Sequence, residues 1–243
     1  MLVCGDIHGN YSKAKTFLQY KPEEKHIFVG DYTDSFKATD HEIIETIRLI
    51  FESDAIKLAG NHDIQYLANA HSYFQCSGKR YAPEFGHLIN MYKNELTAAI
   101  YEDDYVITHG GVTRLLGRNF ERPSDLVDWL NEELKWYIDR PVAPDSLSPI
   151  FHIGSCRGGR EQSGGIFWAD YRYEKFDIRF NQVFGHSHGK DPKKMSVGKK
   201  DKTKFHVLVD IPQFYCYNTK THQFEDFMPE DVKKNRDMLE RSY

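Results

Sequence analysis

The sequence predicts an α/β fold. Over the first 60 residues, short apolar runs alternate with segments whose apolar residues recur at helical spacing. This alternation is typical of βαβ units and a parallel sheet. Five apolar runs along the chain end on polar residues beside a glycine, as strands do where they turn into loops. The chain has 243 residues, 40% of them hydrophobic, which suits one large domain with a sizeable core.

The N-terminal elements follow from this alternation. Residues 1–4 predict the first strand, residues 11–20 a helix that ends before Pro22, and residues 26–29 the second strand. Asp40 opens a helix that runs through residue 51 with isoleucines along one face. Residues 55–59 predict the third strand.

The remaining elements are less regular. Residues 64–101 carry a helical pattern, interrupted around residues 77–86, and residues 105–108 predict a fourth strand. A helix begins at Pro123 and ends before Pro141, and a loop rich in Pro, Gly and Ser follows to residue 165. Strands are predicted at 182–184, 205–211 and 214–218, and a short helix in the charged tail from residue 225. We expect a single domain over residues 1–243, with helical insertions at about 64–101 and 112–165.

The composition favours a globular cytoplasmic protein. The net charge of −4 gives no overall bias toward nucleic acid or anionic membranes. No apolar run approaches the ~20 residues that span a bilayer, and the first strand begins at residue 1, where a signal peptide would stand. The four cysteines form no C-x-x-C pair, so we expect them to be reduced packing residues. A cytoplasmic location without a membrane partner is the expectation.

The candidate metal-binding and catalytic residues lie at the strand ends. Asp6 and His8 lie two apart after the first strand, so in extended backbone both side chains face the same side. The other strand ends carry Asp31, Asp34, Asn61, His62, His109, His186 and His188. The carboxyl ends of strands in an α/β sheet share one crevice, so we expect these groups to converge. Their mix of carboxylate, imidazole and carboxamide suits manganese, iron or zinc, and their number suits two ions.

The ordered set of motifs resembles a known family. The motifs are Gly5-Asp6-Ile7-His8-Gly9, Gly30-Asp31-Tyr32-Thr33-Asp34, Gly60-Asn61-His62-Asp63, His109-Gly110-Gly111 and Gly185-His186-Ser187-His188. Together they resemble the calcineurin-like metallophosphoesterases, and the first four are most similar to the Ser/Thr phosphoprotein phosphatase branch. The resemblance implies a sandwich of two mixed β-sheets flanked by helices.

The resemblance also implies a site for two divalent ions, for which manganese is the first expectation and iron or zinc the alternatives. By the family pattern, Asp6 and His8 bind the first ion and Asp31 bridges the two. The second ion is completed by Asn61, His109 and His186. His188 fits the diesterase branches, in which the last histidine of G-H-x-H returns to the first ion. Such a pair of ions holds phosphate oxygens and lowers the pKa of a shared water, whose hydroxide attacks phosphorus.

The same pattern assigns two catalytic residues. His62 is implied as the acid that protonates the leaving alkoxide. Asp34 would orient the His62 imidazole through its other ring nitrogen. The alternative for His62 is a structural role at the start of a helix.

One family residue is absent. The phosphatase branch carries an arginine directly after its G-D-x-x-D motif, and this chain has Ser35 there. A monoester dianion would lose a charge-assisted contact of about 1.5–3 kcal/mol. Candidate replacements that would bind substrate are Arg172, Arg157 and Arg160, although each also fits a solvated surface charge.

A basic stretch follows the last metal motif. Seven lysines lie between Lys190 and Lys204, and they could attract an anionic substrate or nucleic acid. The stretch holds no aromatic residue between its end lysines that could stack bases. A solvated hairpin loop is the simpler interpretation, and nucleic acid is not the expected partner.

These patterns predict a metal-dependent phosphoesterase that acts on phosphate monoesters of a phosphorylated protein or small molecule. The alternative is a phosphodiesterase or a nucleotide hydrolase, including one that cleaves dinucleoside polyphosphates. An alternative of another class is a non-catalytic scaffold on the same fold, which would usually have lost metal ligands. The sequence leaves the oligomeric state open.

Overall fold

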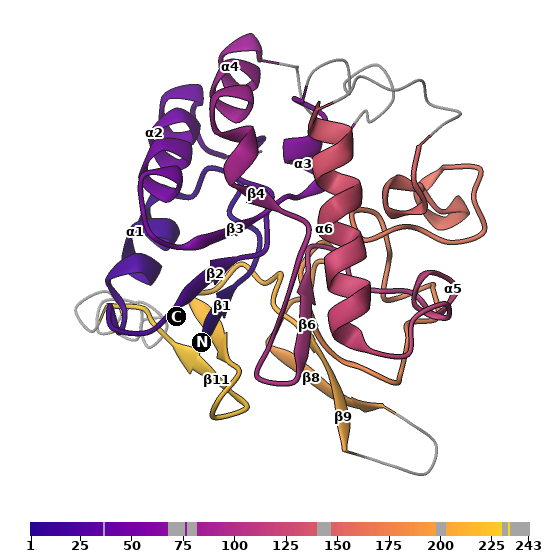
Figure 1. Cartoon of the computed structure of the whole chain (residues 1–243). Helices are drawn as coiled ribbons and strands as arrows, with labels where there is room; N and C mark the ends of the chain where they lie inside the picture. Colours follow the sequence, from indigo (N-terminus) through magenta and orange to yellow (C-terminus); the bar gives the residue numbers. More distant parts are fainter. Residues whose placement is uncertain are drawn as a thin grey trace.

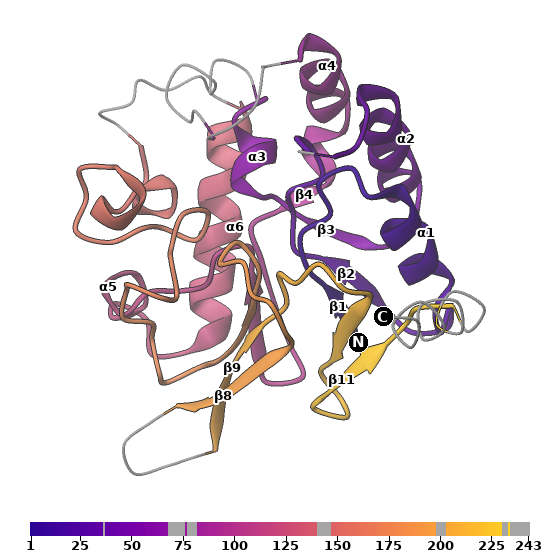
Figure 2. The same cartoon turned by 180° about the vertical axis from the view of Figure 1, so that it is seen from behind.

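The computed structural model describes residues 1–35, 37–67, 76, 82–139, 147–197, 203–229 and 233. Two mixed β-sheets lie face to face between layers of helices (Figures 1 and 2). This confirms the predicted α/β class and the two-sheet sandwich. The single-domain organisation stays a prediction.

The first sheet contains the N-terminal strands. Its strand order is β11-β10-β1-β2-β3-β4, with β1 to β4 parallel and β10 and β11 antiparallel. The bounds are β1 Leu2–Cys4, β2 His26–Phe28, β3 Ile56–Leu58, β4 Leu96–Thr97, β10 Tyr215–Asn218 and β11 Gln223–Asp226. Because β1, β2 and β3 run in the same direction, the loops that leave them open at one edge of the sheet.

The second sheet has the order β5-β6-β7-β9-β8, with β6, β7 and β9 parallel. The bounds are β5 Ala99–Glu102, β6 Tyr105–Thr108, β7 Asn181–Phe184, β8 Lys193–Val197 and β9 Lys204–Leu208. Alternate residues of both sheets, such as Val3, Ile27, Ile107 and Val183, are fully buried in one core between the sheets. This core fixes the two sheets against each other, since each residue's inward position follows from the strand period of two.

Helices cover the outer faces. Helices α1 Tyr11–Gln19, α2 Asp40–Phe51 and α4 Pro83–Tyr92 lie on the first sheet, and α6 Pro123–Asp139 lies along β5 (Figure 1). The predicted helices at 11–20 and 40–51 are confirmed. Thr39 and Glu42 close a capping box at the start of α2, which satisfies two otherwise unpaired backbone donors. Shorter helices are α3 Asn61–Ile64, α5 Arg114–Gly117, η2 Lys93–Glu95, η4 Pro149–Phe151 and η5 Ser155–Arg157.

The helical pattern predicted over residues 64–101 is wrong at its C-terminal end. Helix α4 is followed by η2, and residues 96–97 and 99–102 form β4 and β5. Strand β5 turns into β6 through Asp103 and Asp104, both at positive φ, as in a two-residue hairpin. Short apolar stretches do not distinguish a buried strand from a helix, and pairing with β6 decides the outcome. Residues 68–75 and 77–81 lie outside the described residues.

Two further expectations are corrected. The lysine-rich stretch is not only a loop, because Lys193 and Lys194 lie on β8, which pairs with β9. The charged tail begins with β11, which pairs with β10, and most of the predicted short helix lies outside the described residues. All four cysteines are free. Within the described ranges, no helix has the length and apolar character of a membrane span.

Candidate metal centre

The predicted site residues lie at the carboxyl ends of five strands. Loops after β1, β2 and β3 of the first sheet meet loops after β6 and β7 of the second. The groups were expected to converge in one crevice, and the ends of strands from both sheets contribute to it. Both sheets present the ends of parallel strands here, which is where open α/β sheets bind ligands.

Asp31 lies at the centre of the site. Its carboxylate is buried, with Oδ2 3.5 Å from His8 Nε2 and Oδ1 3.5 Å from His109 Nε2. Ligand atoms gather in two groups that share Asp31, one with Asp6 and His8 and the other with His109 and His186. Within each group these atoms lie within 4.8 Å of one another. Burial opposes ionisation of Asp31, but the surrounding imidazoles outweigh it and lower the pKa of this carboxyl.

Hydrogen bonds to backbone carbonyls orient the histidines. His8 Nδ1 donates to the Asp34 carbonyl oxygen at 2.7 Å, and His109 Nδ1 donates to the Val29 carbonyl oxygen at 2.9 Å. In each bond the ring proton is on Nδ1, so Nε2 is unprotonated and its lone pair faces Asp31. The tautomers are therefore those that a metal ligand requires.

Three side chains converge in the second group. Asn61 Oδ1 lies 2.9 Å from His109 Nε2 and 2.9 Å from His186 Nδ1. The amide of Asn61 is oriented by Cys76, whose Sγ is 3.1 Å from Asn61 Nδ2. Because the ring proton of His109 is on Nδ1, its Nε2 and Asn61 Oδ1 are both acceptors, and their lone pairs repel at this distance unless a cation lies between them. Burial also lowers the pKa of His109 and of His186, which favours the neutral form that binds metal. The residues present therefore fit a divalent ion.

The first group is crowded with carboxylates. Asp6 is buried and accepts a hydrogen bond from the His186 backbone N–H at 3.1 Å. Burial and the neighbouring carboxylates of Asp210 and Asp31 raise the pKa of Asp6. A divalent cation would relieve this repulsion. Sequence analysis missed Asp210, because it fell inside the predicted strand 205–211, whereas β9 ends at Leu208.

His188 does not join either group. Its side chain is 63% exposed, and its Nδ1 lies 3.5 Å from Asp210 Oδ1. The structure thus brings six of the seven predicted ligands together through direct contacts and leaves His188 at the rim. A cavity of about 450 Å³ opens there, and Asp6, His8, Ser35, His188 and Asp210 are among its lining residues.

His62 and Asp34 lie together beside Asp31. His62 Nδ1 is 2.8 Å from Asp34 Oδ2, and the His62 backbone N–H donates to Asp31 Oδ1 at 2.9 Å. Asp34 also accepts hydrogen bonds from Gln65 and from the Tyr66 hydroxyl. Burial disfavours the charged imidazole, but the carboxylates of Asp31 and Asp34 outweigh it and raise the pKa of His62. A protonated His62 is the form that can donate a proton.

Asp63 is a structural residue of the site that sequence analysis did not identify. Its carboxylate accepts backbone hydrogen bonds from Asp31, Tyr32, Thr33 and Gly60 at 2.7–3.3 Å. These bonds fix the loop after β2 against the loop after β3. Burial and the Asp31 charge raise the pKa of Asp63 to about 7, against the opposing effect of the backbone N–H donors. Its place directly after Asn61 and His62 was the available signal.

The three arginines differ in position. Arg157 Nη2 lies 2.9 Å from Asp170 Oδ2 and 3.5 Å from the His186 carbonyl oxygen. Arg172 binds the same carboxylate at 2.7 Å, with its side chain 52% exposed. Arg160 is exposed and makes no ion pair within the described ranges. Of the three, Arg157 is in hydrogen-bonding range of a ligand residue's backbone.

Ser35 takes a local structural role. Its Oγ accepts hydrogen bonds from the backbone N–H groups of Lys37 and Ala38 at 3.1 and 2.9 Å. The side chain is buried within its own turn. It therefore offers no charge to a phosphate.

Comparisons with known proteins agree with this geometry. A family model described as calcineurin-like phosphoesterase matches residues 1–190. Among solved structures, a cold-active protein tyrosine phosphatase at 1.1 Å is similar, with a TM-score of 0.59, 16% identity, and coverage of 91% of this chain and 70% of that chain. The cold-active protein-tyrosine phosphatase of a psychrophilic Shewanella species has a TM-score of 0.56 and 14% identity, with 93% and 80% coverage. A putative diadenosine tetraphosphatase has a TM-score of 0.50 and 15% identity, with 92% and 90% coverage. At these identities the structures show a shared fold.

Proposed function

The chain belongs to the calcineurin-like phosphoesterase family, and from this premise we propose that it hydrolyses phosphate monoesters, including phosphoserine and phosphothreonine in proteins. The observation that carries the proposal is the pair of ligand groups that share the buried Asp31, with His62 beside them. A shared carboxylate is how proteins hold two cations close enough to act on one phosphate.

The ligand residues divide between two ions. Asp6, His8 and Asp31 would hold the first, and Asp31, Asn61, His109 and His186 the second. When bound, two divalent ions supply charge that neutralises phosphate oxygens and lowers the pKa of water. Manganese is our proposal for the metal, because the site combines carboxylate, carboxamide and imidazole ligands.

His62 supplies the proton for the leaving group. Asp34 holds Nδ1, so Nε2 is the nitrogen left to hold and release a proton. Asp31 and Asp34 favour the protonated imidazole. An alkoxide of serine or threonine is a poor leaving group and needs this proton, so His62 suits an alkyl phosphate.

Arg157 supports the preference for monoesters. A monoester dianion carries more charge than a diester and gains more from a guanidinium. Arg157 lies near the His186 backbone and is held by Asp170. Arg157 therefore places a positive charge near the ligand residues, which Ser35 does not.

A second candidate is a phosphodiesterase or dinucleoside polyphosphate hydrolase. Ser35 and the 450 Å³ cavity favour it, because the cavity beside Asp6 and His8 leaves room for a second ester group. One structure of similar fold is titled a putative diadenosine tetraphosphatase.

One assay separates the two. The manganese-loaded protein is given p-nitrophenyl phosphate, its bis ester, diadenosine tetraphosphate and a phosphoserine peptide, with Asp31→Asn as the inactive control. We expect higher kcat/KM for the monoesters. A strong preference for the bis ester or the dinucleotide would replace the first candidate with the second.

A further inference from the structure

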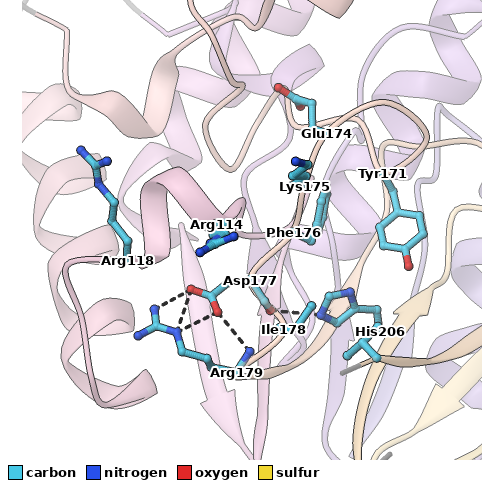
Figure 3. Close-up of a pocket in the computed structure, with 11 residues that line it drawn as sticks. Arg114, Arg118, Tyr171, Glu174, Lys175, Phe176, Asp177, Ile178, Arg179 and His206 are labelled. Carbon is cyan, nitrogen blue, oxygen red and sulfur yellow. Dashed lines mark hydrogen bonds and ion pairs between the residues drawn. The ribbon is translucent and has the colours of Figure 1, made fainter. Parts of the chain in front are cut away.

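A second concave region lies away from the metal centre, along α5. Its main cavity has a volume of about 700 Å³ and lies between α5, the segment of residues 171–179 and His206 of β9 (Figure 3). An adjoining cavity of 530 Å³ shares Arg114, Arg118, Glu174 and Lys175 with it. A third, of 390 Å³, shares Leu115, Arg118 and Ser163 with the second. We call these three cavities the α5 groove.

The α5 groove carries excess positive charge. The main cavity is lined by four cations, Arg114, Arg118, Lys175 and Arg179, and by two carboxylates, Glu174 and Asp177. Four minus two leaves a formal charge of +2 there, on a chain whose net charge is −4. Burial lowers the pKa of His206 to about 4, so this residue adds no charge near neutral pH.

The two carboxylates are already occupied. Arg179 Nε lies 2.9 Å from Asp177 Oδ1 (Figure 3). Arg179 Nη2 also donates to the Gly117 carbonyl oxygen at 2.8 Å. Glu174 accepts backbone hydrogen bonds from Gly164 and Asp170 at 2.6 and 2.7 Å. In the part of the chain that the structure describes, neither carboxylate forms an ion pair with another cation of the groove.

Three cations therefore remain without an acidic partner. Arg114, Arg118 and Lys175 make no ion pair among the described residues. All three are exposed. Backbone hydrogen bonds link their positions: the Arg114 N–H donates to the Lys175 carbonyl oxygen at 2.7 Å, and the Arg118 N–H donates to the Arg114 carbonyl oxygen at 3.1 Å. Unpaired cations gathered in one concave site complement an anionic partner.

Exposed apolar side chains line the same groove. Leu115, Tyr173 and Ile178 are 40%, 71% and 48% exposed, and all three line the α5 groove. They are three of seven large hydrophobic residues exposed in the described part of the chain. Their concentration in one groove is typical of a protein-binding surface rather than of scattered surface residues.

We propose that the α5 groove binds an extended acidic segment of a partner polypeptide, with apolar side chains between its Asp and Glu residues. Three joined cavities suit an extended chain better than a compact ion. The cations and the exposed apolar side chains of the groove would match both kinds of side chain. This proposal is independent of which phosphoester the metal centre cleaves.

The test is direct binding by fluorescence anisotropy. The probe is a fluorescein-labelled 12-residue peptide of Glu and Asp with Leu and Phe between them. Full-length protein is compared with Arg114→Glu/Arg118→Glu and with Lys15→Glu/Lys135→Glu, a control that makes the same charge change at exposed sites outside the groove. Ile178→Ser tests the apolar contribution. Unlabelled competitors are the same peptide, a (dT)12 oligonucleotide and inorganic tripolyphosphate.

We expect the groove variant to weaken peptide binding by about tenfold or more and the control variant to change it by less than about twofold. Ile178→Ser should weaken it by a smaller factor. Hydrolysis of p-nitrophenyl phosphate should be unchanged in all variants, which separates this proposal from the assigned chemistry. Equal losses in both charge variants would overturn the proposal. So would no measurable binding, or displacement by (dT)12 or tripolyphosphate as effective as by the peptide.

Discussion

His62 Nδ1 lies 2.8 Å from Asp34 Oδ2, and the same carboxylate is fixed by Gln65 and Tyr66. His62, Gln65 and Tyr66 thus hold the Asp34 carboxylate in place. This carboxylate itself contacts none of the atoms that would bind metal. We therefore expect Asp34 to influence catalysis through the orientation and charge of the His62 imidazole.

Asp34→Asn should therefore slow the reaction in a way that depends on the leaving group. Asparagine keeps the shape but removes the charge that favours protonated His62. For a phosphoserine peptide, we expect kcat to fall on the order of tenfold to a hundredfold. For p-nitrophenyl phosphate, whose leaving group departs without a proton, kcat should change little. Equal losses on both substrates would contradict the role of this pair in proton donation.

Asp31→Asn should remove metal and activity together. The carboxylate is common to both ligand groups, so the amide weakens both sites at once. Protein purified with manganese should contain close to two ions per chain by elemental analysis, and the variant clearly fewer, with turnover abolished. The fold should persist, because the Asp31 backbone N–H remains bound to Asp63. Asp54→Asn, at an exposed position, is the control. Full activity in Asp31→Asn would refute the bridging assignment.

Much of this site could be predicted because its ligands are local to strand ends. Asp6, His8 and Asp31 each follow an apolar run, and strand direction then brings them to one edge. Asp210 was missed because the exact end of β9 depends on pairing with β7 and β8, which lie elsewhere in the chain. Strand β5 was missed for a similar reason, since only its pairing with β6 makes it a strand. The α5 groove joins residues 114–118 to residues 162–179, a proximity that no local pattern contains.

Asp63→Asn should destabilise the protein although Asp63 is not a metal ligand. Four backbone N–H groups point at its two oxygens. An amide replaces one oxygen with an NH₂ donor, which leaves buried N–H groups unpaired and facing another donor. We expect the free energy of unfolding to fall by about 2–4 kcal/mol. Urea denaturation of the metal-free protein measures this without contribution from bound ions, and Asp54→Asn should differ from wild type by less than about 0.5 kcal/mol. If the free energy of unfolding fell by less than about 0.5 kcal/mol in Asp63→Asn, the loops would not depend on this carboxylate.

His206 should make stability depend on pH. It is buried in the second sheet, and its Nε2 donates to the Asp177 carbonyl oxygen at 3.1 Å. Burial lowers the pKa of His206 from 6.5 to about 4, so the folded protein disfavours the proton that the unfolded chain accepts. The unfolded state then binds more protons between these two values, and stability is lost as the pH falls through this window.

The variant His206→Gln, which keeps a donor for Asp177, removes this dependence. As the pH falls, the unfolding free energy of the wild type should therefore decrease relative to that of the variant. The shift has an upper limit of about 3 kcal/mol, set by 1.36 kcal/mol per pKa unit. Urea denaturation at about pH 7.5 and about pH 5 measures it, and only part of the limit should be reached at the lower value because it lies inside the window. His41→Gln, at an exposed position on α2, should leave the wild-type slope unchanged. If His206→Gln also left it unchanged, proton binding at His206 would contribute nothing to acid unfolding.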